Sequence, residues 1–296
     1  MFVPSILFAL VACTPKDEAV DTSEAADTDT DTDTDTDTDT DTDTDTDTDT
    51  DTDTDTDTDT DTDTDTDTDT DTVACSAPSF AGPAPVVSYA FEDAGSTTVV
   101  DSSGDYDAAS TGGVTSVLGK VGYAALLDGA GAYLEATVPV STGAFSWAGW
   151  VRLDALPSDF GSISGHANGP MAYTGWLLVV NSAGVPTLYT EGGSGAYELA
   201  TGATAALTIG AWTHIAATFD AGNVVFYVNG VAVASQDVGY AAITASDNPY
   251  VLGRDTNNGA RFLAGALDEA GYWSAALTAG DIEALVIDGE CGLSSL

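Results

Sequence analysis

The sequence predicts an all-β sandwich of two antiparallel sheets, preceded by a disordered acidic tether. From Val73 onward, short apolar runs are broken by Gly, Asn, Asp and Ser roughly every 8 to 12 residues, which is typical of a sandwich. Helical periodicity is almost absent from this part of the chain. Asn229-Gly230 lies between two apolar runs and predicts a hairpin, because both central residues of a type I′ turn need a positive φ.

The strand candidates follow one another along the globular part, and a short helix is predicted after the last of them. The predicted strands are residues 86–91, 132–138, 145–153, 175–180, 212–220, 224–228 and 262–273. Thr278 is placed to cap the helix, and Asp281 follows three residues later. Ile282, Leu285 and Val286 share one helical face and are expected to cover apolar surface.

The N-terminus has the features of a bacterial lipoprotein signal. Residues 1–12 are almost wholly apolar but fall short of the about 20 residues that span a bilayer, so a signal peptide is predicted. Leu10-Val11-Ala12-Cys13 resembles a lipobox, which implies that Cys13 is acylated and becomes the mature N-terminus. Two or three acyl chains suffice for stable anchoring. Thr14 favours the outer membrane by the same resemblance; a chance apolar N-terminus is the alternative.

A long acidic tether is expected between this anchor and the globular part. Residues 27–72 repeat Asp-Thr 23 times, so residues 13–72 are predicted to be disordered and extended by charge. A coil of this tract spans roughly 35 to 40 Å. A plain stalk is expected, with O-glycosylated threonines and weak Ca²⁺ condensation on the aspartates as alternatives.

Net charge excludes some classes of partner. Residues 1–72 carry 27 acidic side chains and one lysine, a charge of −26, and the rest carries 21 acids and four bases, a charge of −17. A field this negative repels nucleic acid and anionic lipid. Contact with a membrane is therefore expected only through the lipid anchor.

Two further cysteines bracket the globular domain, which is assigned to residues 73–296. Cys75 and Cys291 lie near its ends, and export to an oxidising compartment predicts a disulfide between them. Such a bridge is worth on the order of 5 kcal/mol in the chain-entropy model. Two free thiols are the alternative. A zinc site is not predicted, because no CxxC or paired-histidine spacing accompanies His166 and His214.

An ordered set of short motifs covers the whole domain. They are Tyr89-Ala-Phe-Glu-Asp, Val100-Asp-Ser-Ser-Gly104, Leu127-Asp-Gly129, Tyr133-Leu134, Phe145-Ser-Trp-Ala-Gly-Trp150, Trp212-Thr-His-Ile-Ala216, Phe226-Tyr-Val-Asn-Gly230, Leu252-Gly253, Leu263-Ala-Gly-Ala-Leu-Asp-Glu-Ala270, Tyr272-Trp273 and Ala276-Leu-Thr278. This set resembles the laminin-G-like jelly roll of the concanavalin A-like superfamily. The resemblance implies a two-sheet jelly roll, and it implies no single function, since the family includes carbohydrate-binding, protein-binding and adhesive modules.

Strand alternation indicates where a ligand would lie. In residues 212–220, His214 falls on the less apolar face, and Tyr227 of the next strand is its expected neighbour. A sugar is predicted to stack there. Trp147 and Trp150 are three apart in one strand and are expected on opposite faces. The alternative is that the outer face is covered and that these aromatic side chains, like His214, have packing roles.

Calcium is the predicted cofactor, because related jelly rolls often bind one Ca²⁺ ion and this domain is rich in carboxylates. The resemblance places its ligands at Asp268, Glu92, Asp93 and Asp101, with Asp268 and Glu92 sharing the ion if the first and last strands are neighbours. The alternative is that these carboxylates only build turns.

No catalytic motif is present, and the protein is not expected to be an enzyme. A glycoside hydrolase needs two carboxyl groups about 5 to 9 Å apart, whereas Glu135, Glu191 and Glu198 are isolated in the sequence. The sequence therefore predicts a binding or adhesion module on a bacterial cell envelope, displayed in the periplasm or on the surface, with a carbohydrate ligand. A protein-interaction or surface-coat component is the alternative.

Overall fold

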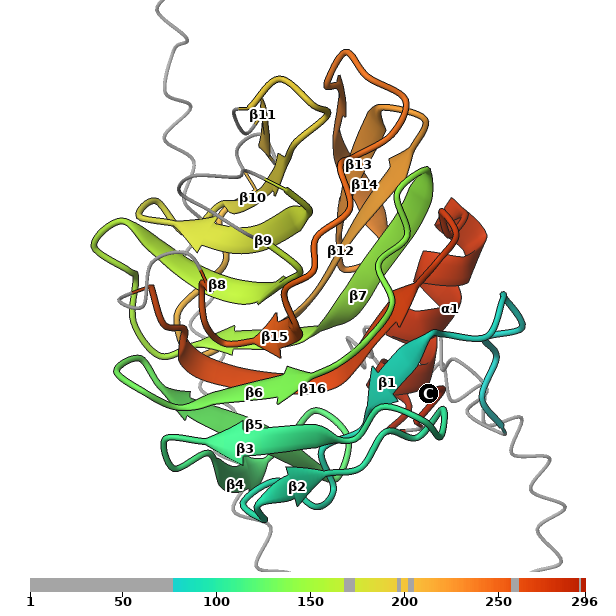
Figure 1. Cartoon of the computed structure of the whole chain (residues 1–296). Helices are drawn as coiled ribbons and strands as arrows, with labels where there is room; N and C mark the ends of the chain where they lie inside the picture. Colours follow the sequence, from blue (N-terminus) through green and yellow to red (C-terminus); the bar gives the residue numbers. More distant parts are fainter. Residues whose placement is uncertain (1–76, 168–173, 196–197, 202–204, 257–260, 293) are drawn as a thin grey trace, which may run out of the picture. The chain divides into compact units, whose positions relative to one another are not determined.

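The computed structural model describes residues 77–296 except for 168–173, 196–197, 202–204, 257–260 and 293. This part of the chain is an antiparallel jelly-roll sandwich of two sheets with a single helix (Figure 1). The predicted leader, Cys13, the Asp-Thr tract and Cys75 lie outside the described residues, and the expectations for them stay predictions.

Each sheet contains eight strands, and all strand pairs are antiparallel. Sheet 1 has the order β14-β13-β12-β7-β16-β5-β4, and β1 also pairs with β16. Its strands are β1 (Val87–Tyr89), β4 (Thr115–Leu118), β5 (Tyr123–Asp128), β7 (Ala144–Leu153), β12 (Trp212–Asp220), β13 (Asn223–Val228), β14 (Val231–Asp237) and β16 (Ala264–Trp273).

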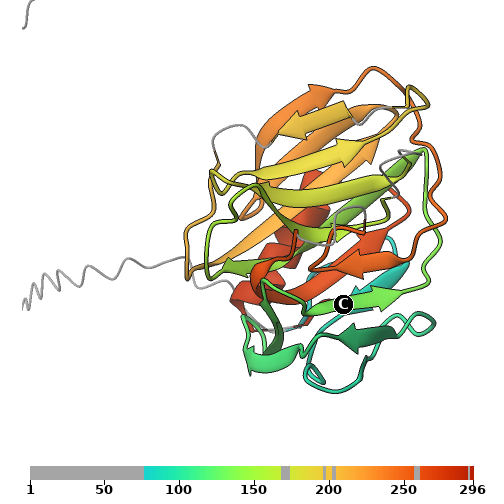
Figure 2. The same ribbon diagram turned by 60° about the vertical axis from the view of Figure 1, so that its left-hand side comes forward.

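Sheet 2 has the order β11-β10-β9-β8-β15-β6-β3-β2 and packs against sheet 1 (Figure 2). Its strands are β2 (Thr98–Val99), β3 (Ala108–Thr111), β6 (Tyr133–Ala136), β8 (Phe160–Gly165), β9 (Trp176–Asn181), β10 (Pro186–Thr190), β11 (Glu198–Thr201) and β15 (Tyr250–Leu252).

The predicted strands are all present, as β1, β6, β7, β9, β12, β13 and β16. The predicted hairpin is also confirmed. Asn229 and Gly230 have φ values of 48° and 80°, and Val228 pairs with Val231 across the two-residue turn.

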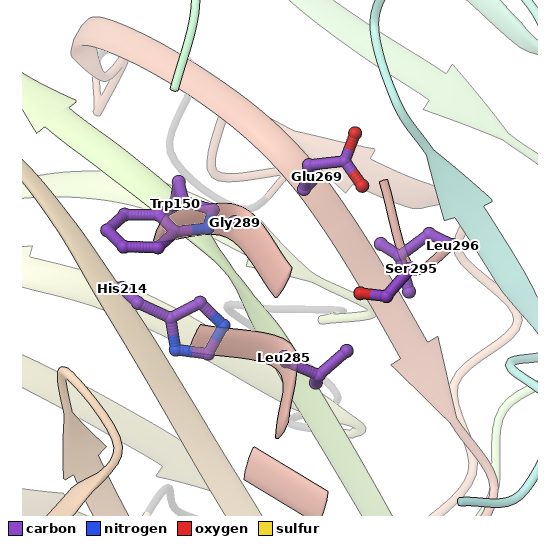
Figure 3. A pocket seen from close by; sticks show the side chains of 7 residues that line it. All are labelled: Trp150, His214, Glu269, Leu285, Gly289, Ser295 and Leu296. Atoms are coloured by element: carbon purple, nitrogen blue, oxygen red, sulfur yellow. The ribbon is translucent and has the colours of Figure 1, made fainter. Parts of the chain in front are cut away.

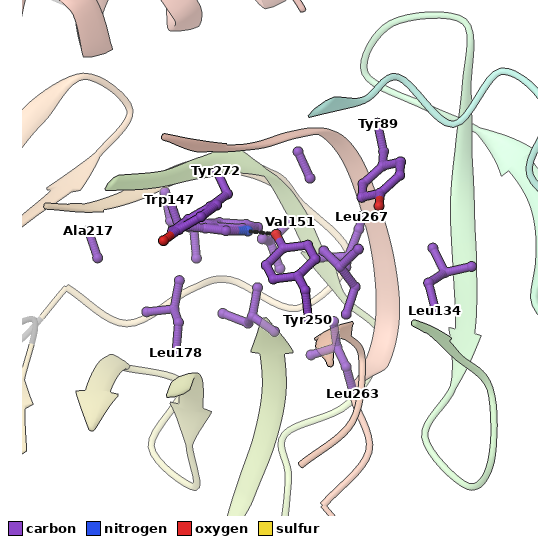
Figure 4. Close-up of a cluster of buried hydrophobic side chains, with 14 of the residues drawn as sticks. Tyr89, Leu134, Trp147, Val151, Leu178, Ala217, Tyr250, Leu263, Leu267 and Tyr272 are labelled. Atoms are coloured by element: carbon purple, nitrogen blue, oxygen red, sulfur yellow. Dashed lines mark hydrogen bonds between the residues drawn. The ribbon is translucent and has the colours of Figure 1, made fainter. Parts of the chain in front are cut away.

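Aromatic side chains fill the core between the sheets (Figure 4). Trp147 is fully buried there, and its Nε1 donates to the hydroxyl of Tyr250 at 3.1 Å. Phe145 stacks on Trp176 with ring centres 5.1 Å apart. Trp150, three residues after Trp147, points to the other face of sheet 1 and is also buried. The predicted opposite orientation of the two tryptophans is confirmed, and both have packing roles.

One helix, α1 (Ala279–Glu290), covers the outer face of sheet 1. Thr278 and Asp281 form the predicted capping box, in which each side chain accepts a hydrogen bond from the other residue's backbone. Ile282 and Leu285 pack on the sheet with Trp273. Among the residues described here, no helix is long and apolar enough to cross a bilayer.

The segment before β1 is fastened to this helix. Asp288 of α1 is buried, and its carboxylate accepts hydrogen bonds from the backbone of Ser79 at 2.6 Å and Phe80 at 3.0 Å. Ser79 follows Cys75 by four residues, and Asp288 precedes Cys291 by three. This contact brings the two ends of the domain together, which favours the predicted disulfide, although Cys75 lies outside the described part.

Replacing the helix cap tests how far α1 contributes to stability. Thr278→Ala removes the acceptor for the Asp281 backbone, and we expect it to lower the free energy of unfolding by about 1 kcal/mol. Denaturant unfolding of the full-length chain carrying Cys13→Ser measures the change. Thr137→Ala, at an exposed position outside the strands, is the matched control and is expected to have no effect. Equal stability of the two variants would contradict a role for the capping box.

Candidate functional site

The face on which the sequence placed a ligand is covered in the structure. His214 and Tyr227 are only 2% and 7% exposed. Tyr227 packs with Leu285 of α1, and the His214 ring meets the Trp150 ring edge-on at 5.3 Å. The expectation of a sugar platform at His214 and Tyr227 is therefore corrected, because α1 occupies that face.

A cavity of about 10 Å³ remains beneath the helix (Figure 3). His214 and Glu269 line it, and neither His214 Nδ1 nor Glu269 Oε1 has a hydrogen-bond partner in the described part of the chain. Glu269 Oε2 accepts a hydrogen bond from Ser294 at 2.8 Å. A cavity of this size is at the lower limit for one water molecule and is too small for a sugar.

Strand β16 changes its neighbour on one side at Asp268. Residues 264–267 pair with β5, whereas residues 270–272 pair with β1. The Asp268 carboxylate lies at this change of partner, where Oδ2 accepts hydrogen bonds from the backbone of Lys120 at 2.6 Å and Val121 at 2.9 Å. Asp268 thus joins the last strand of sheet 1 to the turn between β4 and β5.

Glu92, which follows β1, reaches the same turn. Its Oε1 accepts a hydrogen bond from the backbone of Tyr123 at 3.1 Å. A Cβ at Gly122 would collide with the Glu92 carboxylate, and a Cβ at Gly119 would collide with Asp268 Oδ2, so glycine lets both carboxylates approach. Because β1 and β16 are neighbours, the structure brings Asp268 and Glu92 to one turn, as the sequence suggested.

The other two predicted metal ligands build turns. Asp93 accepts a hydrogen bond from the backbone of Val100. The Asp101 carboxylate accepts hydrogen bonds from Ser88, Ser103, Asp105 and Tyr106. Burial acts to raise the pKa of Asp101, but these hydrogen bonds outweigh it and hold the pKa below its usual value.

Calcium at Asp268 and Glu92 stays a prediction. Ca²⁺ takes six to eight oxygen ligands, and three of the four oxygens of these two carboxylates already accept backbone N–H groups. Across residues 77–296, apart from the gaps named above, no group of three or more His, Cys, Asp or Glu side chains is arranged to hold a metal ion. An ion here would need ligands beyond the predicted set.

The backbone of Glu269 is strained, and the pKa of its side chain is raised. Its φ of 44° lies in the left-handed region, which is costly for a residue with a Cβ. Burial raises the pKa of Glu269 to about 8 and that of Asp268 to about 7, despite hydrogen bonds that act to lower both. The neighbouring charges act in the same direction as burial: those of Asp268 and Glu92 on the pKa of Glu269, and that of Glu92 on the pKa of Asp268. At neutral pH, Glu269 is therefore mostly protonated.

The outer face of sheet 2 carries a different cluster, the aromatic–arginine surface. It consists of half-buried side chains from β6, β8, β10 and the segment between β15 and β16: Tyr133, Phe160, Tyr189, Arg254, Arg261 and Phe262. The Arg254 guanidinium lies 4.0 Å from the centre of the Tyr133 ring, and that of Arg261 lies 4.9 Å from the Phe160 ring. Two of the four basic residues of the domain therefore lie over aromatic rings on this face.

Carboxylates fix these arginines in place. Arg261 donates to Asp159 at 2.8 Å and 3.1 Å and to the buried Asp255 at 3.3 Å. Arg254 lies 3.5 Å from Glu135. Flat guanidinium groups held by carboxylates against aromatic rings give a rigid surface that offers both apolar faces and N–H donors.

A hollow of about 180 Å³ adjoins this surface at one end of the sandwich. Phe160 and Phe262 belong to both features. The remaining lining comes from the loops that follow β5 and β7, from β8 and from the start of β16, and it consists of Gly129, Ala155, Leu156, Pro157, Ser158, Gly161, Leu263 and Ala264. We call it the Phe160–Phe262 hollow. A larger hollow of about 340 Å³ lies beside Phe91, but that aromatic side chain is buried, whereas Phe160 and Phe262 are only half-buried.

Sequence reasoning missed this site. Residues 160, 254 and 261 were not singled out, because strand β8 contains glycine and serine and its arginine partners lie in an irregular segment. A usable signal existed. In a domain with only four basic residues, Arg254 and Arg261 lie seven residues apart, and Phe262 follows directly.

A family model described as the concanavalin A-like lectin/glucanases superfamily matches residues 128–283. The chain belongs to this superfamily. The match spans β6 to the first turn of α1 and includes the aromatic–arginine surface and the hollow. The jelly-roll resemblance seen in the sequence is confirmed. A comparison with curated proteins found no significant match.

Solved structures share the fold at low sequence identity. Domain 4 of AbnA, an extracellular arabinanase of Geobacillus stearothermophilus solved with arabinotriose, is 24% identical with a TM-score of 0.55; the match covers 68% of this chain and 98% of that domain. The binding domain of Paraclostridial Mosquitocidal Protein 1 is 17% identical with a TM-score of 0.54, over 68% of this chain and 51% of that one.

The receptor-binding domain of a botulinum neurotoxin C/D mosaic serotype is 15% identical with a TM-score of 0.53, over 70% and 51% of the two chains. The present chain thus spans about half the length of the two toxin domains. At these identities, the likeness establishes the fold.

The buried carboxylates predict a loss of stability as pH rises above neutral. Between the pKa of a free glutamic acid and about 8, the folded chain keeps a proton on Glu269 that the unfolded chain releases, so unfolding becomes easier as pH rises. Burial lowers the pKa of His166 to about 4 and of His214 to about 3, and these residues add stability with rising pH only up to about 6.5.

Glu269→Gln isolates this effect, because it keeps the shape and removes the titration. Between pH 6.5 and 9, we expect the free energy of unfolding to fall less steeply than in the parent chain, by on the order of 1 kcal/mol over the range. Glu283→Gln, on the exposed side of α1, is the control and should leave the slope unchanged. Identical slopes in all three proteins would show that Glu269 ionises normally.

Proposed function

We propose that this protein is a non-catalytic, lectin-like binding module held at a bacterial cell envelope, with carbohydrate as its ligand. The observation that carries the proposal is the aromatic–arginine surface beside the Phe160–Phe262 hollow. Sugars present apolar C–H faces and polar hydroxyl groups, and a binding site for them combines aromatic rings with fixed hydrogen-bond donors. This combination lies on sheet 2, which α1 leaves uncovered.

The comparisons support a saccharide ligand. The superfamily is described as lectins and glucanases, and AbnA domain 4 was solved with arabinotriose. The toxin domains named above are binding domains by their descriptions, which keeps a protein or glycoprotein ligand as the alternative. A surface-coat component without a small ligand is the third possibility.

The carboxylates isolated in the sequence support a binding role over glycoside hydrolysis. Glu191 is buried, and its Oε1 accepts hydrogen bonds from the backbone of Gly193 at 2.7 Å and Gly195 at 2.8 Å. Glu135 pairs with Arg254. Both carboxylates therefore have structural partners.

We further propose that acylated Cys13 anchors the chain, in the outer membrane by preference, and that the Asp-Thr tract holds the domain away from the lipid. The resemblance of residues 10–13 to a lipobox and the charge of the tract support this arrangement. The module would then act in the periplasm or on the cell surface. Calcium bound near Asp268 is the accompanying cofactor proposal.

A glycan array tests the binding role. The full-length chain carrying Cys13→Ser is screened with and without Ca²⁺, and we expect saturable binding to one class of sugar. Phe160→Ala removes an aromatic side chain from the surface and should weaken that binding at least about tenfold, the size of one lost stacking contact. Tyr123→Ala, an exposed aromatic position on sheet 1, is the control and should bind as the parent does.

The same screen separates the remaining alternatives. Silence on the array in both conditions would contradict the carbohydrate proposal and favour a protein ligand or a coat role. Release of reducing sugar from the bound glycans would contradict the non-catalytic role. If Ca²⁺ raises the melting temperature, Asp268→Ala should remove the response; an unchanged response in this variant would remove Asp268 from the proposed calcium site.

Membrane anchoring predicts a simple fractionation result. The wild-type chain is expected in the membrane fraction and should incorporate a labelled fatty acid. Cys13→Ser should lose the label and move to the soluble fraction, because no other lipid attachment is expected. Ser23→Ala in the tether is the control. Retention of Cys13→Ser in the membrane fraction would contradict the anchor.

A further inference from the structure

The Phe160–Phe262 hollow has the size of a site for one small ring. Its volume of about 180 Å³ lies below the roughly 300 Å³ at which pockets for drug-sized ligands begin. Leu263, which is 1% exposed, belongs to both the core and the lining and closes the hollow on its inner side. An extended chain of several sugars therefore does not fit inside, whereas a single residue at the end of a chain does.

The aromatic walls are held by their neighbours. Phe160 meets the edge of Tyr189 at 5.4 Å as well as the Arg261 guanidinium, and Phe262 lies 6.5 Å from Tyr133. These contacts reduce the side-chain freedom that binding would otherwise remove. The two phenylalanines are thus positioned before a ligand arrives.

The charges around the hollow favour an uncharged ligand. Arg261 uses three of its five N–H groups on Asp159 and Asp255, so its positive charge is balanced in place. The domain as a whole carries −17, which repels carboxylate and phosphate groups. The N–H groups of Arg261 beyond these three suit neutral hydroxyl oxygens.

Gly161 shows where the hollow has free space. A Cβ built there would meet Leu263, Phe262 and Pro157 at 3.5 to 3.7 Å, which is ordinary van der Waals contact. All three of these residues line the hollow, so a side chain at position 161 would point into it. By contrast, Gly129 has a φ of 70° and a built Cβ would clash with Ala264, so it does not tolerate substitution.

We propose that the Phe160–Phe262 hollow binds one uncharged sugar residue at the end of a glycan, packed against the two phenylalanines. The proposal rests on the lectin-like function above and adds the site, the charge class and the position of the sugar in its chain. The rest of the glycan would lie outside the hollow, along the aromatic–arginine surface.

Filling the hollow tests this proposal. In the full-length chain carrying Cys13→Ser, Gly161→Leu places a branched side chain in the space, whereas Gly161→Ala adds only the tolerated Cβ. Binding is measured by calorimetry with arabinotriose and with the neutral methyl glycosides of arabinose, xylose, galactose, glucose and mannose. Methyl glucuronide is the charged comparator.

We expect at least one neutral methyl glycoside to bind. Gly161→Leu should weaken it more than about tenfold, and Gly161→Ala should stay within about twofold of the parent. Methyl glucuronide should not bind. If Gly161→Leu lowers the melting temperature, Phe262→Ala serves as the second test variant, and it should also weaken binding.

The outcomes separate this inference from the general function. If glycans bind the parent chain but Gly161→Leu and Phe262→Ala bind them equally well, the hollow is not the site while the lectin-like function stands. Tighter binding of methyl glucuronide than of the neutral sugars would overturn the charge class. If no saccharide binds the parent chain, here or on the array, the general function fails as well.

Discussion

The organisation of sheet 1 depends on the hydrogen bonds of one carboxylate. Strand β16 pairs with β7 on one side. On its other side it pairs first with β5 and then with β1, which follow one another along the same edge of β16. Between the residues that pair with β5 and those that pair with β1, β16 has no partner strand on this side. There, Oδ2 of Asp268 accepts hydrogen bonds from the backbone of Lys120 and Val121. The first strand, the β4–β5 hairpin and the last strand therefore meet at a buried side chain. The strained backbone of Glu269 and the two raised pKa values arise at the same junction.

The helix decides which face of the sandwich is open. Strand β16 leads into α1, whose start is capped by Thr278. The helix packs on Ala148, Ala216 and Tyr227 and covers this part of the outer face of sheet 1. Within the described part of the chain, no helix covers the aromatic side chains on the outer face of sheet 2, and two of the four basic residues of the domain lie over them. The aromatic–arginine surface therefore lies on the sheet opposite the one that strand alternation alone favoured.

Local patterns in the sequence were sufficient for the features that depend on few residues. Asn229-Gly230 specified its hairpin, and Thr278 with Asp281 specified the helix start. Strands such as β3 (Ala108–Thr111) and β8 carry alanine, glycine and serine, which have little intrinsic strand preference, so only pairing with neighbours reveals them. The candidate site could not be predicted from local sequence patterns for a related reason. Tyr133, Phe160 and Arg261 come from separate segments, and period-two alternation says which face a residue takes but not what covers it.

The course of β16 also suggests how the domain would bear load. Phe262 and Leu263, at the hollow, lead directly into this strand; its other end leads to α1, whose Asp288 holds the segment that connects to the tether. A pulling force applied between a ligand in the hollow and the N-terminal segment would run lengthwise along β16. The hydrogen bonds that β16 makes with β7, β5 and β1 would then be sheared together instead of being broken one by one.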